Sequence, residues 1–190
     1  MSAHPVLMTG AEAPVVDAQA TRKARFRGMV GDHFSDIWRF LRHLGVVAHG
    51  VDDAAQEVFL IAWQRLDEIQ PGSERPFLFT TAFRIAQASR RRVRREVPDE
   101  DVESTLDASS PTPEQQLDDK QARDLAHRLL KGLEEELRVV FVLYEIEGFT
   151  MQKIAELTEV PRGTVASRLR RAREIFQARF DRYMTPRGGQ

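Results

Sequence analysis

The residues of this chain best suited to chemistry are arginines gathered on one short segment near its C-terminal end. Five arginines and no acidic residue lie between Pro161 and Arg173, and Thr164 and Ser167 add small hydrogen-bonding side chains. Arginine pairs with guanine edges and with phosphates, so a helix with this polar face suits the major groove of DNA. A run of charge alone usually indicates only a solvated helix face.

The residues before these arginines supply the rest of a helix-turn-helix pattern. Thr150 can cap a first helix, Pro161 lies in the first turn of a second, and residues 158–160 are left to form the turn. Apolar residues recur at a spacing that lets two short helices share one small core. They are Ile154, Ala155, Leu157, Val160, Val165 and Leu169. Turn, caps and a face of one charge together predict a DNA-binding unit.

The other residue types give no sign of an active site. The histidines are His4, His33, His43, His49 and His127. They form no zinc-binding spacing, and the chain has no glycine-rich phosphate loop and no serine elbow before a helix. Cysteine is absent, which excludes disulfides and thiolate metal sites and suits a reducing cytosol. We therefore expect no catalytic residue, no metal and no cofactor.

Charge is distributed unevenly along a chain whose formal net charge is only −1. Residues 84–95 hold six arginines and no acid, whereas residues 96–119 hold nine acidic residues and no base. Local fields steer a polyanion more than the net charge does, so a nucleic-acid partner stays compatible with this composition. The apolar run at residues 139–144 is too short to cross a bilayer, and the N-terminus lacks a signal-peptide core. We expect a cytoplasmic protein.

Abundant helix formers and apolar spacings of three and four residues predict an all-α fold. A first helix begins near Arg22 and ends at Gly45, and a second begins at Asp52 or Asp53. Residues 70–76 form a loop because they hold two prolines and a glycine. The buried stripe of the second helix is predicted to be Ala55, Val58, Phe59, Ala62, Leu66 and Ile69.

A third helix follows, with Pro76 near its start and three phenylalanines before the arginine cluster. Phe77, Phe79 and Phe83 could form a stacking platform for unpaired bases. The alternative is that Phe79 and Phe83, one turn apart, fill the core of three helices, and we favour this interpretation for both. An exposed aromatic side chain near Phe77 would favour stacking.

The acidic segment is predicted to be a flexible linker between two small helical domains, because it has too few apolar residues to offset its ordering entropy. A helix near Pro113, a central helix at residues 134–147 ended by Gly148, and the helix-turn-helix follow. The linker could also act as a decoy for the two basic surfaces. The division we expect is a leader at 1–21, a first domain at 22–95, a linker at 96–113, a second domain at 114–184 and a tail at 185–190.

Taken together, these motifs resemble the extracytoplasmic-function sigma factors, the small two-domain subunits that give bacterial RNA polymerase its promoter specificity. The likeness covers roughly residues 26–180. It is carried by HFSDIWRFLRHLG (33–45), DDAAQEVFLIAW (52–63), RPFLFTTAFRIA (75–86) and VVFVLYEIEGFTMQKIAELTEVPRGTVASRLRRARE (139–174). The first domain would then be sigma region 2 and the second sigma region 4.

The resemblance implies partners and site residues. The helix with Asp53, Gln56, Glu57 and Phe59 would dock on a coiled coil of the largest polymerase subunit, and the second domain would meet the polymerase flap. The polar face of the helix with Asp53, Gln56 and Glu57 also carries Gln64, and it has no obvious partner inside its own domain. The sequence leaves open whether an anti-sigma factor holds the protein inactive.

Promoter DNA is the other implied partner. The loop at 67–76 and the helix after it would engage the non-template strand at the minus-10 element, with a base flipped into a pocket as the duplex opens. The side chains expected there are Phe77, Arg84, Arg91 and Arg92. Those expected to contact the minus-35 element in the major groove are Arg162, Thr164, Ser167, Arg170 and Arg171.

The sequence departs from the family pattern at four positions. Glu159 occupies a turn position where relatives commonly have glycine, and Ala166 stands where a lysine or arginine is frequent. Arg84 and Ala88 replace an asparagine and an aspartate often found in the minus-10 helix. These departures bear on which promoter sequence is read more than on the mechanism.

Two other functions use the same motifs. A stand-alone helix-turn-helix transcription regulator would bind promoter DNA unaided, but it usually needs dimer symmetry and a sensing domain. An antagonist that mimics a sigma factor would bind polymerase without starting transcription. Binding to core polymerase distinguishes the regulator from the sigma factor.

Overall fold

The computed structural model describes residues 18–96 and 124–185, and the regular structure within these ranges is entirely helical. The all-α fold class is therefore confirmed. The elements are α1 (Ala18–His43), α2 (Ala48–Gln64), the 3-10 turn η1 (Leu66–Glu68), α3 (Glu74–Glu96), helical residues 124–131, α5 (Glu135–Phe141), the π-helical turn η2 (Val142–Ile146), α6 (Met151–Thr158) and α7 (Arg162–Met184). Most of the expected leader, the acidic linker with its proposed decoy role, and the end of the tail lie outside the described residues.

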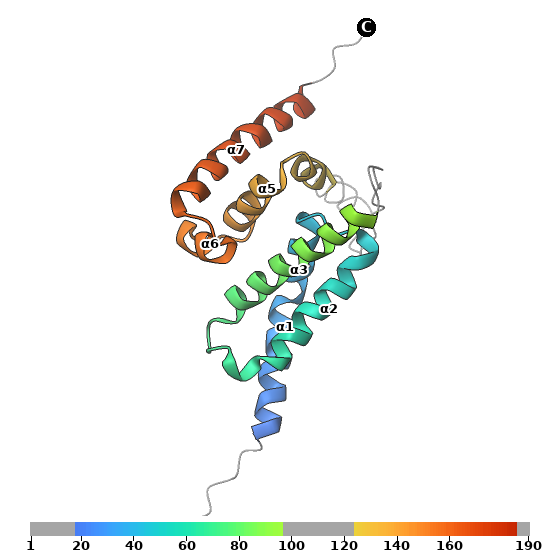
Figure 1. The fold of residues 1–190 in the computed structure, drawn as a ribbon, viewed down its shortest axis with the longest axis vertical. Coiled ribbons are helices and arrows are strands. Elements are labelled where there is room, and N and C mark those ends of the chain that lie inside the picture. Colours follow the sequence, from blue (N-terminus) through green and yellow to red (C-terminus); the bar gives the residue numbers. More distant parts are fainter. Residues whose placement is uncertain (1–17, 97–123, 186–190) are drawn as a thin grey trace, which may run out of the picture.

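Helices α1, α2 and α3 pack against one another and form the three-helix unit (Figure 1). Its core holds the whole stripe predicted for the second helix, from Ala55 to Ile69, although α2 ends at Gln64 and the last two members follow it. Gly45 ends the first helix as expected, with φ at +89°, a value that costs glycine little.

Two predicted helix starts were wrong. The first helix begins at Ala18, inside the expected leader, since Ala18 and Ala20 are strong helix formers. The second begins at Ala48 without a side-chain cap. Asp52 does not cap it, because its carboxylate accepts a hydrogen bond from Trp38 Nε1 at 2.8 Å.

The loop before α3 is shorter than predicted, because α3 already begins at Glu74. Pro76 fits inside the first turn, where backbone N–H groups have no intrahelical partner. Phe79 and Phe83 are buried, which confirms their predicted place in the core. Phe77 is half-buried, and the Arg65 guanidinium lies 5.6 Å from its ring centroid.

The C-terminal unit, residues 124–185, is built on α5 and η2, whose apolar run is largely buried. Gly148 ends this central helix with φ at +68°. Thr150 caps α6 by accepting a hydrogen bond from the Lys153 N–H at 3.2 Å, as predicted. Glu159 adopts the left-handed conformation, with φ 59° and ψ 34°, and α7 starts one residue after Pro161.

The two units touch along α3. Helix α3 lies between the other two helices of its unit and the C-terminal unit, and α6 packs against it (Figure 1). The buried apolar residues of both units form one continuous cluster. Among the described helices, none is both long and apolar enough to cross a membrane.

Candidate partner-binding groove and DNA-binding faces

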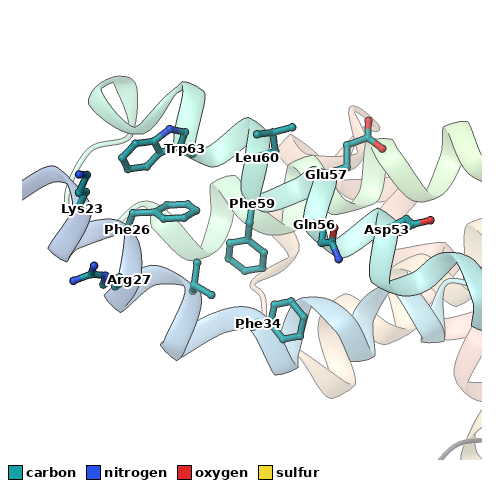
Figure 2. Close-up of a pocket in the computed structure, with 11 residues that line it drawn as sticks. Lys23, Phe26, Arg27, Phe34, Asp53, Gln56, Glu57, Phe59, Leu60 and Trp63 are labelled. Carbon is teal, nitrogen blue, oxygen red and sulfur yellow. The ribbon is translucent and has the colours of Figure 1, made fainter. Parts of the chain in front are cut away.

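A groove of about 790 Å³ runs between α1 and α2 on the three-helix unit. Figure 2 shows side chains from both helices converging on it. It is lined by Lys23, Phe26, Arg27, Val30, Phe34, Asp53, Gln56, Glu57, Phe59, Leu60 and Trp63. All four residues predicted to bind core polymerase are therefore brought together in one concave surface.

Aromatic rings form the base of the groove. Phe59 is buried and stacks on Phe34 with ring centroids 5.8 Å apart, and Phe26 meets Trp63 edge-on at 5.1 Å. Leu60 stays 56% exposed and Phe34 38% exposed beside them. An apolar surface of this kind gains free energy when a partner removes it from water.

Charged side chains flank the apolar base with opposite signs. Lys23 and Arg27 project from α1, whereas Asp53 and Glu57 project from α2 (Figure 2). Such an arrangement favours a partner that offers apolar side chains with charges of both signs beside them.

Leu60 was missed in the sequence, although a signal was present. It lies on the same helix face as Asp53, Gln56, Glu57 and Gln64, where an apolar residue interrupts an otherwise polar pattern. Phe34 falls on the apolar stripe of the first helix, whose members recur every three or four residues, so its spacing alone predicts burial. Only the packing of α1 on α2 reveals that it is partly exposed at the groove.

Two arginines of α1 hold the end of α2 against it. Arg22 donates to the Trp63 carbonyl at 2.7 Å, and its guanidinium lies 4.2 Å from the Trp63 ring centroid. Arg25 donates to the Leu66 carbonyl at 3.1 Å and pairs with Glu74 at 2.8 Å. These contacts fix the two walls of the groove relative to one another.

The predicted minus-35 residues lie on the outer face of α7. The side chains of Arg162, Ser167, Arg170 and Arg171 are exposed, and Thr164 is half-buried. The opposite face, with Val165, Leu169 and Ala172, packs into the core.

The remaining arginines of this segment are engaged within the unit. Arg168 pairs with Glu136, and Arg173 donates to Glu145 Oε1 at 2.6 Å. Arg173 is also exposed, and Arg170 pairs with Glu174 of the same helix at 3.0 Å. Arg168 and Arg173 differ from the predicted contacts because their pairs reach the central helix, a distinction that composition cannot make.

The residues predicted to contact the minus-10 strand differ in whether they are free to contact DNA. Phe77, Arg84 and Arg91 recur every seven residues and therefore share one side of α3. Arg91 is exposed, whereas Arg84 pairs with Glu159 of the C-terminal unit at 3.0 Å. The side chain of Arg92 lies outside the described part of the chain.

Within the described part of the chain, no cluster of histidine and carboxylate side chains could hold a metal ion.

Comparison with known proteins assigns both units. Residues 29–97 match the family model of sigma-70 region 2, and residues 123–175 match that of sigma-70 region 4. The chain is 31% identical over 149 residues to the ECF RNA polymerase sigma factor SigE of Mycolicibacterium smegmatis, covering 77% of this chain and 58% of that protein. It is 30% identical over 140 residues to the ECF RNA polymerase sigma-E factor of Escherichia coli, covering 66% and 71%.

Solved structures with the same fold include two complexes. CnrH, solved in complex with the cytosolic domain of CnrY, matches with a TM-score of 0.62 and 24% identity, over 85% of this chain and 94% of that one. The sigma factor RpoE of Bartonella quintana, solved with the anti-sigma factor NepR, matches with a TM-score of 0.67 and 22% identity, over 83% and 97%.

Proposed function

The chain belongs to the extracytoplasmic-function sigma factors, and we propose that it binds core RNA polymerase through the α1–α2 groove and directs it to promoters. The observation that carries this proposal is that Asp53, Gln56, Glu57 and Phe59 line one apolar groove with charged edges. The coiled coil of the largest polymerase subunit is the proposed occupant. The protein is a non-catalytic subunit that acts in the cytoplasm, where polymerase works.

The groove has the chemistry that a helical partner needs. Fully burying a leucine or phenylalanine side chain contributes about 1.5–3 kcal/mol. A partner that covers the remaining 56% of Leu60 and 38% of Phe34 would therefore gain roughly a half and a third of that amount, respectively. Gln56 and Glu57 lie at the rim, where a polar partner side chain sets orientation. The flap of the polymerase is the second contact that we propose, through the C-terminal unit.

Promoter reading is divided between the two units. Arg162, Arg170 and Arg171 present guanidinium groups to the minus-35 major groove, where one bidentate contact to guanine carries ~1–3 kcal/mol of discrimination. The α3 residues Phe77, Arg84, Arg91 and Arg92 meet the opened minus-10 strand. We also propose an anti-sigma factor as a partner, because the similar RpoE structure was solved in complex with the anti-sigma factor NepR.

A competition assay with purified core polymerase tests the proposal. Leu60→Asp should weaken binding at least tenfold, because it places a charge where an apolar contact forms (roughly 1.4 kcal/mol per tenfold). Changing Gln56 and Glu57 to alanine should weaken binding less. Glu68→Ala is the matched control, because Glu68 is an exposed carboxylate just beyond the same helix and outside the groove.

Two results would count against the proposal. If folded wild-type protein fails to bind core polymerase, the sigma-factor assignment of this chain is wrong. If wild type binds and Leu60→Asp binds equally well, the groove is not the docking site. Specific promoter binding by the free protein would favour a stand-alone regulator instead.

A further inference from the structure

We propose that Arg25 of α1 is a positioning residue that fixes the loop between α2 and α3, and thereby sets which base of the opened minus-10 strand this loop accepts. The inference rests on the proposed function, because the loop at residues 67–76 is expected to meet that strand. Arg25 lies on a different helix, and its guanidinium is directed at the protein rather than at DNA.

The loop consists of two short turns with one buried residue between them. The 3-10 turn η1 comes first, and Ile69 follows it with its side chain in the core. A β-turn at residues 70–73 comes next, closed by a backbone hydrogen bond of 2.9 Å between its end residues. Its third residue, Gly72, has φ at +81°, which a type II turn requires at that position. Both turns are local, so neither of them fixes where the loop stands relative to the helices.

Arg25 supplies this fixed position with a single guanidinium. Its Nη1 donates to the Leu66 carbonyl at 3.1 Å, and its Nη2 donates to the Ile69 carbonyl and, at 2.8 Å, to Glu74 Oε1. Leu66 begins the loop, Ile69 lies in its middle and Glu74 is the first residue of α3. Because the planar fork of arginine donates in fixed directions, one side chain sets the beginning, the middle and the end of the loop relative to α1.

The contacts of Arg25 are partly shielded from water. The side chains of Arg25 and Glu74 are 31% and 20% exposed, so salt screens their attraction less than that of a surface pair. The two carbonyl groups belong to Leu66 and Ile69, whose side chains are buried. A buried acceptor that loses its donor costs free energy, so release of Arg25 from the loop is unfavourable.

The acidic residues of the loop are paired, which keeps the loop compatible with a polyanion. Asp67 pairs with Arg22 of α1 at 3.2 Å, and Arg22 also donates to the Trp63 carbonyl at 2.7 Å. Glu68 pairs with Arg65 at 2.6 Å. These arginines offset two negative charges that would otherwise repel the phosphates of an approaching strand.

The outer side of the loop stays available to a strand. Residues 70–73 are exposed, and the half-buried Phe77 follows in the first turns of α3. A base taken out of its stack is read by hydrogen bonds to its edge and by stacking against side chains. Hydrogen bonds weaken steeply with poor geometry, so a loop that moves relative to α3 distinguishes the bases less well. Arg25 therefore acts on base choice through the loop, without contacting DNA.

Hydrogen exchange of the free protein tests whether Arg25 fixes the loop. Arg25→Lys keeps the positive charge, but one ammonium nitrogen cannot replace contacts that two guanidinium nitrogens make. Backbone amides of residues 67–73 should therefore exchange about tenfold faster than in wild type, or more. Arg39→Lys is the matched control, because Arg39 is an exposed arginine of the same helix whose pair with Asp36 stays within that helix. It should leave the exchange of the loop unchanged.

Base preference of the reconstituted holoenzyme tests the consequence. A preferred promoter is selected from a random library, and its minus-10 strand is then supplied as labelled single-stranded oligonucleotides with every base at each position. Wild type should prefer one base by about tenfold or more at a position that the loop contacts, and Arg25→Lys should prefer it by about threefold or less. Binding to core polymerase should be unchanged. A purely structural role would lower the affinity for all oligonucleotides together and leave the preference intact.

Glu74→Gln is the second variant, and it decides the question if Arg25→Lys loses helicity. It keeps an acceptor for Arg25 and removes only the charge, so exchange of the loop should rise by about two- to fivefold. Base preference should fall in the same direction as for Arg25→Lys, by a smaller factor.

The outcomes separate this inference from the proposed function. If neither variant changes exchange of the loop, Arg25 does not fix it and the inference is refuted, whatever the protein does with polymerase. If exchange rises but base preference equals that of wild type, Arg25 holds the loop without affecting base choice, which also overturns the inference. If wild type does not bind core polymerase, the proposed function fails, whereas faster exchange in the variants would still establish that Arg25 fixes the loop.

Discussion

Replacing Glu159 by glycine should stabilise the folded protein slightly, although it removes an ion pair. The left-handed backbone at Glu159 costs a residue with a side chain roughly 1–2 kcal/mol, and glycine avoids this cost. The lost pair with Arg84 is largely exposed and contributes about 0–1 kcal/mol. The expected net change is therefore about 0–2 kcal/mol in favour of the variant. For a chain of this length, that raises the melting temperature by about 0–8 °C.

The Glu159→Gln variant separates the two contributions. It keeps the backbone cost and loses only the charge, so its melting temperature should be equal to or below that of wild type. The glycine variant should melt about 2–8 °C above the glutamine variant. Thermal unfolding followed by circular dichroism at low ionic strength measures both. If the glycine variant melts below the glutamine variant, the left-handed turn does not carry the cost argued here.

Two other predictions follow from the DNA-binding face and from the buried carboxylate. Arg171→Glu should lower the affinity of the holoenzyme for a selected promoter about tenfold without changing core binding. Arg182→Glu, on the same helix beyond the predicted contact, should have little effect. If both variants bind the promoter equally well, Arg171 is not part of the DNA-binding site. Burial raises the pKa of Glu147 to about 7 from its ordinary 4.5, so the folded protein gains stability as pH falls through 7 and loses it as pH rises. Between pH 8 and pH 6, the free energy of unfolding of wild type should rise by about 1.4 kcal/mol relative to that of Glu147→Gln, measured by denaturant titration, and parallel pH profiles would refute this. Burial lowers the pKa of His43 and His127 to about 4, which lowers the stability of the folded protein below their ordinary 6.5, so the comparison with Glu147→Gln is essential.

The helix-turn-helix was predictable because its signals are local. Thr150, Glu159 and Pro161 each act within a few residues of their own position, as a cap, a turn residue and a helix start. The buried stripe of α2 was predictable for the same reason, since a period of 3.6 residues marks it. The start of α2 was not, because the Asp52 carboxylate is occupied by a tertiary contact with Trp38.

The groove was half predicted. Asp53, Gln56 and Glu57 were identified through the resemblance to the family, and their polar face, with no obvious partner inside its own domain, is consistent with that role. Leu60 and Phe34 belong to the same surface, but their exposure depends on how α1 and α2 pack, and spacing along one helix does not report it. Predicting a site that two helices form together requires knowing how these helices pack against each other.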